Sequence, residues 1–440
     1  MHIKREVQAV MQALETAGFA AYAVGGAVRD SLLGKEPFDW DVTTAALPQQ
    51  VMNLFGDNAI PTGLKHGTVT VLRGEERIEV TTYRRDGDYA DHRHPVAVEF
   101  TPSLSEDLQR RDFTVNAIAL SWQGEIMDPF MGQADLQAGL LRAVGDAEQR
   151  FEEDALRILR GLRFASVLDF TVEEGTAAAM REKKELLRQI AAERVLEELT
   201  KLLCGRAVRR VLMDFSDILG VVLPEILPSV GFDHRNPHHC YDVWEHTACA
   251  VENTPPEPIL RWVMLLHDLG KPAVCVYDYE AGKARYGGHQ AASVELAKEI
   301  LPRLRFGSES TRRILRLVEQ HDRLFDPTEK SIRRMLRLFG EEDLRALIHI
   351  RRADNLAQHP DFQQVRQAEL AACDEVLEKV LAEQQCFSLA QLAVNGRDLM
   401  ELGCSGKEIG EMLDALLTAV VEEQLPNDKE SLLAEAKKRR

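Results

Sequence analysis

Hydrophobic and polar residues follow two different patterns along the chain. In the first ~140 residues, apolar or alternating runs typical of β-strands occur at residues 20–24, 68–72 and 78–83, and Gly and Pro separate them. The first six residues instead predict the start of an amphipathic helix. From about Gly145 onward, Ala, Leu, Glu and Arg dominate and apolar residues recur at helical spacing. The pattern therefore predicts an α+β protein, with a small mixed-sheet domain followed by a long all-α part.

The helical part is interrupted at several places rich in Pro, Gly and polar residues. These breaks fall at residues 224–237, 253–258, 278–288 and 358–361. They suggest a division into four segments: residues 1–140, 141–225, 226–360 and 361–440.

Charge and cysteine content narrow the possible functions. The 440 residues include 71 Asp and Glu against 54 Lys and Arg, a formal charge of -17. A protein that coats DNA non-specifically is therefore excluded, and any nucleic-acid site must be a local basic patch on an acidic body. No apolar run reaches the ~20 residues of a membrane span, and the N-terminus does not read as a signal peptide. The seven scattered cysteines form no CxxC pair, which favours a cytoplasmic protein with reduced thiols.

A glycine turn near residue 25 is a candidate phosphate site. Residues 21–30 read as a strand, a tight turn and a helix start. Gly25 and Gly26 would let the backbone approach a bound group closely, and Arg29 is near enough to fork onto a phosphate. On its own, the turn fits a simple strand-to-helix connection as well.

Two aspartates follow the turn in an extended segment. Asp39 and Asp41 are two residues apart, so their carboxylates point to the same side. Such a pair repels itself unless a divalent cation lies between, and Mg²⁺ is the natural occupant. An isolated pair could be a solvated loop, but with the turn upstream it predicts a nucleotidyl-transfer site. Glu79, in an alternating run, is a candidate third catalytic carboxylate; an exposed strand residue is the alternative.

These residues also carry a family resemblance. The segment 25–30, followed by Leu33-Gly34 and Asp39-Trp40-Asp41, resembles the head signature of the class II tRNA nucleotidyltransferases and bacterial poly(A) polymerases. Further motifs follow in the family's order up to about residue 205, at residues 79–84, 86–95, 110–117, 128–130, 150–157 and 193–199. The resemblance implies a nucleotidyltransferase head, a helical neck, Mg²⁺ as cofactor, and ATP, CTP and the 3′ end and acceptor arm of tRNA as partners, with no role for DNA or a membrane.

A run of charged residues spaced by three implies base selection. Asp154, Arg157, Arg160 and Arg163 would lie on one helix over residues 153–164. Asp154 and Arg157 would share a face, whereas Asp154 and Arg163 would lie on opposite sides, so all four could not contact one base. An Asp–Arg pair matches the amine and ring nitrogen of cytosine or adenine, and mispairing UTP or GTP would cost about 1–3 kcal/mol for each group.

The resemblance attributes the choice of C and A to this motif, while an ordinary i,i+3 salt bridge is the alternative. Arg111, Arg160 and Arg163 would then suit the triphosphate or the packing of the neck.

A second constellation occupies the segment 226–360. His246, the adjacent pair His267-Asp268, and Asp354 supply mixed nitrogen and oxygen ligands suited to Mn²⁺, Ni²⁺, Fe²⁺ or Mg²⁺. The pattern resembles the HD phosphohydrolase domain and matches its four ligand positions. It predicts a bound transition metal, with Ni²⁺ and Mn²⁺ as candidates. His289 and His321 could be extra ligands or surface residues.

The predicted reaction is attack of a tRNA 3′-hydroxyl on the α-phosphate of CTP or ATP, adding C, C and A without a template. Addition of A alone and poly(A) synthesis remain alternatives. The loop 86–95 resembles an element of A-capable enzymes, and the acidic balance disfavours poly(A) synthesis. A rival of another class is an HD phosphohydrolase whose head only grips RNA. A non-catalytic RNA-binding protein would leave the paired aspartates unexplained.

Overall fold

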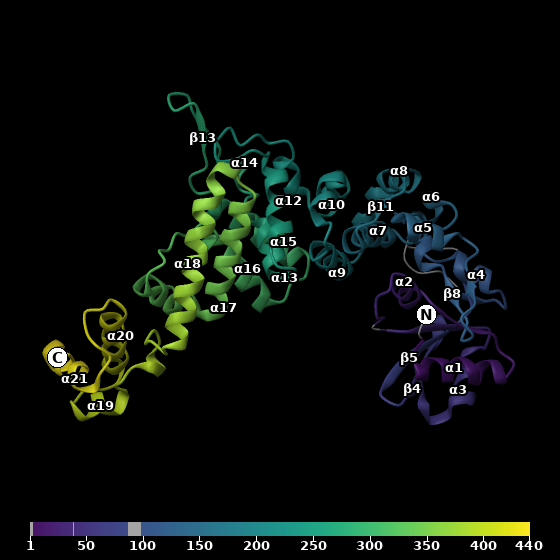
Figure 1. Ribbon diagram of the computed structural model, residues 1–440, viewed down its shortest axis with the longest axis horizontal. Coiled ribbons are helices and arrows are strands. Elements are labelled where there is room, and N and C mark those ends of the chain that lie inside the picture. Colours follow the sequence, from purple (N-terminus) through teal and green to yellow (C-terminus); the bar gives the residue numbers. More distant parts are fainter. Residues whose placement is uncertain (1–2, 38, 87–97) are drawn as a thin grey trace. The chain divides into compact units, whose positions relative to one another are not determined.

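The computed structural model describes residues 3–37, 39–86 and 98–440. The chain divides after Leu227 into two compact units, drawn in Figure 1. The predicted α+β class is confirmed, because one mixed sheet lies near the N-terminus and helices make up most of the rest. The four-segment division stays a prediction. Most of the predicted loop 86–95 lies outside the described residues.

A seven-stranded sheet forms the centre of the head. Its order is β3-β4-β5-β2-β1-β8-β9, and only the β2–β5 pair is parallel among its neighbours. The three predicted strands are present as β1, β4 and β5. The strands of this sheet are β1 (Ala21–Val24), β2 (Asp41–Thr44), β3 (Ala59–Gly63), β4 (Thr68–Arg73), β5 (Glu76–Thr82), β8 (Ala119–Leu120) and β9 (Ile126–Met127).

Helices cover the sheet because each has one apolar side. The predicted N-terminal helix is α1 (Arg5–Thr16), whose buried Val7, Val10, Met11 and Leu14 recur at helical spacing. It packs on β1 and β4, and α3 packs on β3 and β4. The other head elements are α2 (Gly26–Leu32), α3 (Pro48–Phe55), β6 (Arg84–Asp86), β7 (Val98–Phe100), α4 (Leu104–Gln109), the 3₁₀ turn η3 (Thr114–Asn116), α5 (Gly132–Ala138) and β10 (Leu140–Leu141).

The rest of the first unit is a helical neck. Its helices pack in pairs, α6 on α8 and α7 on α9. A two-residue strand, β11, returns to pair in parallel with β10 of the head. The neck elements are α6 (Ala147–Glu153), α7 (Leu156–Leu168), β11 (Thr171–Val172), α8 (Glu174–Lys183), α9 (Ala192–Leu203), α10 (Val208–Asp214) and α11 (Ser216–Val222).

The second unit is helical, as predicted, apart from one small hairpin. The hairpin β12–β13 falls in the break expected at residues 278–288. The helices α12, α13, α15, α16, α17 and α18 pack against one another, and α19, α20 and α21 form a smaller cluster with its own buried core. The elements are α12 (Val243–Asn253), α13 (Pro258–Leu266), α14 (Lys271–Val274), β12 (Val276–Asp278), β13 (Lys283–Arg285), α15 (His289–Arg303), α16 (Ser308–Gln320), α17 (Glu329–Leu356), α18 (Gln363–Ala382), α19 (Gly396–Glu401), α20 (Lys407–Val421) and α21 (Lys429–Arg439).

Within the described part of the chain, no helix combines the length and the apolar character that crossing a bilayer requires.

Candidate nucleotidyl-transfer and metal sites

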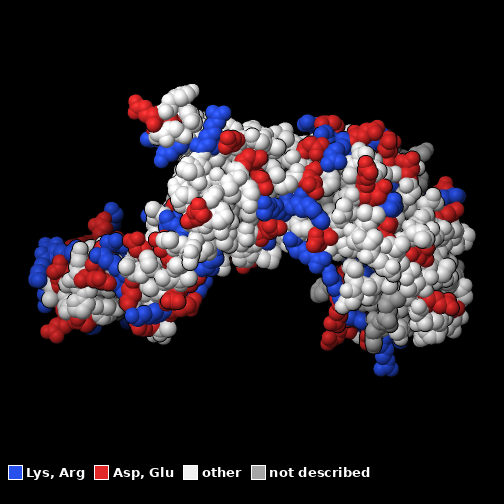
Figure 2. All heavy atoms as spheres, turned by 45° about the horizontal axis from the view of Figure 1, so that its top comes forward, with Lys and Arg blue, Asp and Glu red and all other residues white. Residues whose placement is uncertain are grey.

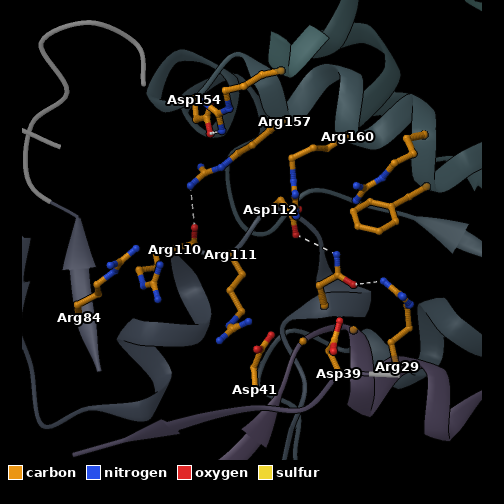
Figure 3. A pocket seen from close by; sticks show the side chains of 16 residues that line it. Arg29, Asp39, Asp41, Arg84, Arg110, Arg111, Asp112, Asp154, Arg157 and Arg160 are labelled. Carbon is orange, nitrogen blue, oxygen red and sulfur yellow. Dashed lines mark hydrogen bonds and ion pairs between the residues drawn. The ribbon is translucent and has the colours of Figure 1, made fainter. Parts of the chain in front are cut away.

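A polar cavity of about 760 Å³ opens in the first unit (Figure 3). Eight of the sixteen residues around it are arginines and four are aspartates. Elsewhere, on the face drawn in Figure 2, acidic and basic side chains are intermixed. The cavity is thus the local basic patch that the acidic composition required. Its lining consists of Gly25, Gly26, Arg29, Asp39, Asp41, Arg84, Arg110, Arg111, Asp112, Asn116, Asp154, Arg157, Arg160, Arg163, Phe164 and Arg194.

The glycine turn forms one side of the cavity. Gly25 has φ 75°, a conformation that favours glycine, and a Cβ there would lie 3.3 Å from Nη1 of Arg111, a tight contact. Arg29, on α2, is 8 % exposed and donates to Oδ1 of Asn116 at 2.8 Å. Its Nε also donates to Asp30 at 2.9 Å. The turn therefore places Gly25, Gly26 and Arg29 together at the cavity, in the arrangement expected of a phosphate cradle.

The paired aspartates lie at the start of β2, the central strand of the sheet. Asp39 precedes β2 and Asp41 begins it, and both side chains reach the cavity (Figure 3). Asp41 is in register with Glu79 across the parallel β2–β5 pair. Burial raises the pKa of Asp41, and the negative charges of Glu79 and Asp39 raise it further. The positive charge of Arg111 opposes this rise. This crowding of negative charge fits a divalent cation. Glu79, however, is not among the residues that line the cavity.

A buried carboxylate behind the cavity orients two of its arginines. Asp107, on α4, has no exposed surface; it pairs with Arg110 at 2.9 Å and with Arg111 at 3.6 Å. Burial alone would raise the pKa of Asp107, but the two guanidinium groups hold it below its ordinary value. Sequence reasoning included Arg111 and missed Asp107 and Arg110. The i,i+3 spacing of Asp107 and Arg110 at the end of α4 is the sequence feature that could have indicated their ion pair.

A second buried carboxylate joins the head to the neck. Oδ2 of Asp112 accepts from Nη2 and Nε of Arg160 at 2.6 and 2.8 Å, and its Oδ1 accepts from Asn116 at 3.0 Å. Burial opposes ionisation, but Arg160 holds the pKa of Asp112 well below its usual range. Because Asn116 also binds Arg29, the network links the neck helix to the glycine turn. Asp112 and Asn116 lie in the quoted motif 110–117 but were not singled out.

The expectation of one continuous helix over residues 153–164 is wrong at its start. Helix α6 ends at Glu153 and α7 begins at Leu156, so Asp154 lies in the break with an extended backbone (φ −139°, ψ 101°). Its Oδ1 accepts from the backbone N–H of Leu156 at 3.0 Å, a local bond that competes with helix continuation. Because the break redirects Asp154, it lines the cavity together with Arg157, Arg160 and Arg163. The helical geometry still relates Arg157, Arg160 and Arg163 on α7, but it does not apply to Asp154, which lies outside the helix.

Asp154 and Arg157 line the same cavity but are bound to different partners. Arg157 is 8 % exposed and donates to Glu153 at 2.8 Å, and also to the carbonyls of Arg150 and Arg110. Asp154 faces Arg194 at 3.7 Å. Asp154 and Arg157 are therefore positioned by other partners and not by a salt bridge to each other. Both side chains line the cavity (Figure 3).

Arg163 and Arg194 complete the neck side of the cavity. Arg163 pairs with Glu198 of α9 at 3.2 Å, and its guanidinium lies 4.1 Å from the ring centre of Phe164. Packing of the neck thus occupies Arg163 while it still borders the cavity. Arg84 and Arg194 were missed as lining residues, because nothing in their local spacing indicates that the chain returns to this place.

The second unit brings the four predicted metal ligands together. Ligand atoms of His246, His267, Asp268 and Asp354 all lie within 4.8 Å of one another. Nε2 of His246 is 3.1 Å from Oδ1 of Asp354 and 3.3 Å from Oδ2 of Asp268. They come from α12, the end of α13, and α17, elements far apart in the sequence. The donor set of two imidazoles and two carboxylates fits a divalent transition metal.

The imidazoles of this cluster are oriented by the backbone. Nδ1 of His246 lies 3.2 Å from the carbonyl of Ala357, and Nδ1 of His267 lies 2.7 Å from that of Met264. A donor on Nδ1 leaves Nε2 to face the centre, as in metal sites. In the described part of the chain, Nε2 of His267 and Oδ1 of Asp268 are buried without a hydrogen bond, whereas Oδ2 of Asp268 lies 2.6 Å from Nζ of Lys271. The lone pairs of these buried atoms therefore suit a metal ion, which accepts them.

The charges in the cluster also favour a cation. Burial alone would lower the pKa of His267, but Asp268 and Asp354 raise it to about 10. His267, His246 and the ammonium of Lys271 hold the pKa of Asp268 far below the ordinary value despite burial, and the two imidazoles do the same for Asp354. The two carboxylates favour a proton on His267, and a metal ion bound in the cluster would take the place of that proton.

The two further histidines are not surface residues. His289 and His321 are buried, and their Nε2 atoms lie 3.5 and 4.0 Å from Oδ1 of Asp268. Both Nδ1 atoms face backbone carbonyls, and the two Nε2 atoms are 3.2 Å apart. Asp268 is therefore shared by two groups of candidate ligands.

Three family models match the chain. Residues 21–142 match the poly A polymerase head domain, and residues 169–229 match the "Probable RNA and SrmB- binding site of polymerase A". Residues 291–436 match the model of tRNA nucleotidyltransferase domain 2. The first match contains the glycine turn and the paired aspartates.

Whole-chain comparisons agree with these matches. The CCA-adding enzyme of Levilactobacillus brevis is 35 % identical over 97 % of this chain and 95 % of its own length. That of Lactiplantibacillus plantarum is 33 % identical over 96 % and 93 %. The crystal structure of the Bacillus stearothermophilus CCA-adding enzyme in complex with CTP has a TM-score of 0.73 at 30 % identity, covering 99 % and 98 % of the two chains. The chain therefore belongs to the CCA-adding enzymes, a group within the poly(A) polymerase and tRNA nucleotidyltransferase family.

Proposed function

We propose that this chain is a class II CCA tRNA nucleotidyltransferase that works in the cytoplasm. It adds C, C and A to the 3′ end of tRNA, using CTP and ATP and releasing pyrophosphate. The observation that carries the proposal is the pairing of Asp39 and Asp41 at a cavity walled by eight arginines. Acidic groups to hold a cation and basic groups to hold a triphosphate thus meet in one place.

Each part of the cavity has a distinct task in the reaction. Asp39 and Asp41 would hold Mg²⁺, whose charge would favour ionisation of the attacking 3′-hydroxyl and offset the charge that builds on the α-phosphate. Glu79 adds negative charge beside Asp41. Arg29 and Arg111 bind the phosphates across the glycine turn, where the absence of side chains lets the triphosphate approach the backbone.

The neck selects the base. Asp154 accepts from the exocyclic amine of cytosine or adenine, and Arg157 donates to the neighbouring ring nitrogen. Glu153 and two backbone carbonyls hold Arg157 in place, so discrimination does not depend on a mobile side chain. Uracil and guanine would each leave both groups mispaired. Arg160 and Arg163 complete the nucleotide site from the same helix.

Incorporation on a tRNA that lacks its 3′ end tests the proposal. With Mg²⁺, CTP alone should add two nucleotides, and a third should appear only when ATP is also present. Addition of A only to a tRNA ending in CC would instead identify an A-adding enzyme. Long runs of A would identify a poly(A) polymerase.

We also propose a metal-dependent phosphohydrolase activity in an HD domain of the second unit. The convergence of His246, His267, Asp268 and Asp354 supports it. A Ni²⁺ or Mn²⁺ ion held there supplies a Lewis acid for a phosphate ester. Purified protein should contain a transition metal, and it should hydrolyse p-nitrophenyl phosphate with Ni²⁺ or Mn²⁺. Absence of both would refute this second function.

Paired variants separate the two functions. Asp41→Asn should abolish nucleotide incorporation and leave ester hydrolysis intact, whereas His267→Ala should do the reverse. Ester hydrolysis without nucleotide incorporation by the unaltered protein would instead favour the rival in which the head only grips RNA.

A further inference from the structure

The carboxylate of Asp107 is buried behind the cavity and touches no open space. Its Oδ2 accepts from Oγ1 of Thr43 at 3.0 Å, and its Oδ1 accepts from the backbone N–H of Arg84 at 3.3 Å. Nε of Arg110 donates to Oδ1 at 3.0 Å, and Nη2 of Arg111 lies 3.6 Å from Oδ2. Asp107 thus ties α4 to β2 and β6. A fully buried anion with this many partners serves the arrangement of the groups around it.

The contact with Thr43 places Asp107 directly behind the cation site. Thr43 is two residues after Asp41 on β2, so both side chains point to the same face of the strand. Thr43 is itself fully buried, and its single hydroxyl proton is shared between Asp107 and the carbonyl of Thr81, 3.2 Å away on β5, the strand that carries Glu79. Asp107 is therefore attached to the strand that presents Asp41 and, through it, to the neighbouring strand.

Arg111 lies between two carboxylates. Figure 3 shows its guanidinium directed toward Asp41, and its other side faces Asp107. The closest ion pair that the described residues provide for Arg111 is Asp107, at 3.6 Å. Among the described residues, no hydrogen bond or ion pair joins Arg111 to Asp41, although their opposite charges attract. Asp107 thus supplies the counter-charge that a buried guanidinium needs.

We propose that Asp107 is a positioning residue that keeps Arg111 from neutralising Asp41, so that Asp41 stays available to the divalent cation while Arg111 stays directed at the phosphates. Without the charge of Asp107, Arg111 would turn to Asp41, toward which its guanidinium is already directed (Figure 3). An arginine bound to Asp41 would compete directly with the metal. The inference rests on the proposed cation site at Asp39 and Asp41.

The test is metal binding by the full-length Asp107→Asn protein. Asparagine has the same shape but only one oxygen, so it keeps an acceptor for either Thr43 or the N–H of Arg84 and removes the charge that Arg110 and Arg111 face. Mn²⁺ is titrated by calorimetry in the presence of CTP, and the head site is the binding step that Asp41→Asn removes. Asp107→Asn should weaken that step about tenfold and should raise the Mg²⁺ concentration for half-maximal incorporation by a similar factor.

Asp135→Asn is the matched control. Asp135 is also a buried carboxylate of the first unit; it accepts from Thr114 at 2.6 Å and pairs with Arg142 at 3.3 Å, but it does not line the cavity. It should change thermal stability without moving the metal step. If Asp107→Asn moves that step no more than Asp135→Asn does, the inference is overturned. A rise in KM for CTP with unchanged metal binding would overturn it as well.

A second variant keeps the inference testable if Asp107→Asn does not fold. Thr43→Val preserves shape and the charge of Asp107 but removes the hydroxyl that holds the carboxylate. It should weaken the same metal step about threefold, and no change would overturn the inference. If Asp41→Asn removes no Mn²⁺ step at all, then the proposed cation site fails, which is a different result from failure of the role of Asp107.

Discussion

At the scale of single residues, Asp39 and Asp41 differ from other exposed acids because they lie side by side at a cavity lined by arginines. Asp39→Asn and Asp41→Asn should each lower incorporation of both CTP and ATP by about 10³-fold or more, because the cation loses a charged ligand. Measurement of kcat with each nucleotide checks this. Asp57 is an exposed aspartate two residues after the end of α3. Asp57→Asn serves as the control and should retain full activity. A tenfold loss or less at Asp41 would contradict the assignment.

Asp112 gives a prediction on stability and pH. Arg160 holds the folded-state pKa of Asp112 well below the unfolded value of about 3.9, despite burial. A lowered folded pKa stabilises the protein above the unfolded value, and that contribution is lost as pH falls toward the folded value. Asp112→Asn should therefore reduce the free energy of unfolding by about 1.5–3 kcal/mol at pH 7. Urea unfolding of both proteins at pH 7 and pH 3 should show the difference shrinking in acid. An equal difference at both values would contradict it.

At the scale of elements, the break between α6 and α7 decides which side chains reach the nucleotide. Glu153 ends α6 and binds Arg157 across the break at 2.8 Å. Glu153→Gln should loosen Arg157 and lower the preference for CTP over UTP by about tenfold, since one well-made polar contact is worth about 1–3 kcal/mol. The ratio of kcat/KM values for the two nucleotides measures this. Glu152→Gln, whose side chain pairs with Lys183 at 2.7 Å, is the neighbouring control. Equal ratios in both variants would exclude the role of Glu153.

The same break shows what the sequence could and could not predict. Local patterns predicted the strands β1, β4 and β5 and the change to helices, because periodicity depends on neighbouring residues. The spacing by three of Asp154, Arg157, Arg160 and Arg163 suggested one continuous helix, so the end of α6 at Glu153 was not predicted. An aspartate before an apolar run is, however, a signal for the start of a helix. Asp107 and Asp112 escaped notice because their roles come from partners on other elements, and Thr43 and Arg160 lie 64 and 48 residues away from them. The metal cluster was predicted because a known motif supplied the long-range pairing.

At the scale of the whole molecule, the two chemical sites lie in separate compact units. Their ligands do not mix, because residues 25–194 supply the cavity and residues 246–354 supply the metal cluster. A cation that binds only the folded cluster should stabilise its own unit by about 2.7 kcal/mol at 100 times its Kd. Calorimetric unfolding with and without Mn²⁺ should therefore show an upward shift in one transition. His267→Ala should abolish the shift, and His349→Ala, on the same helix as Asp354, should retain it.

The shift should also depend on pH in a fixed direction. Asp268 and Asp354 raise the pKa of His267 to about 10, so a proton competes with the cation throughout the neutral range. In protein without added metal, this raised value contributes stability below the unfolded pKa of about 6.5, and the contribution is lost as pH rises toward 10. Because Mn²⁺ must displace the proton, its stabilising effect should increase from pH 6 to pH 8. A shift that is constant or falls over this range would mean that the ion binds outside the cluster, through ligands that carry no proton to lose.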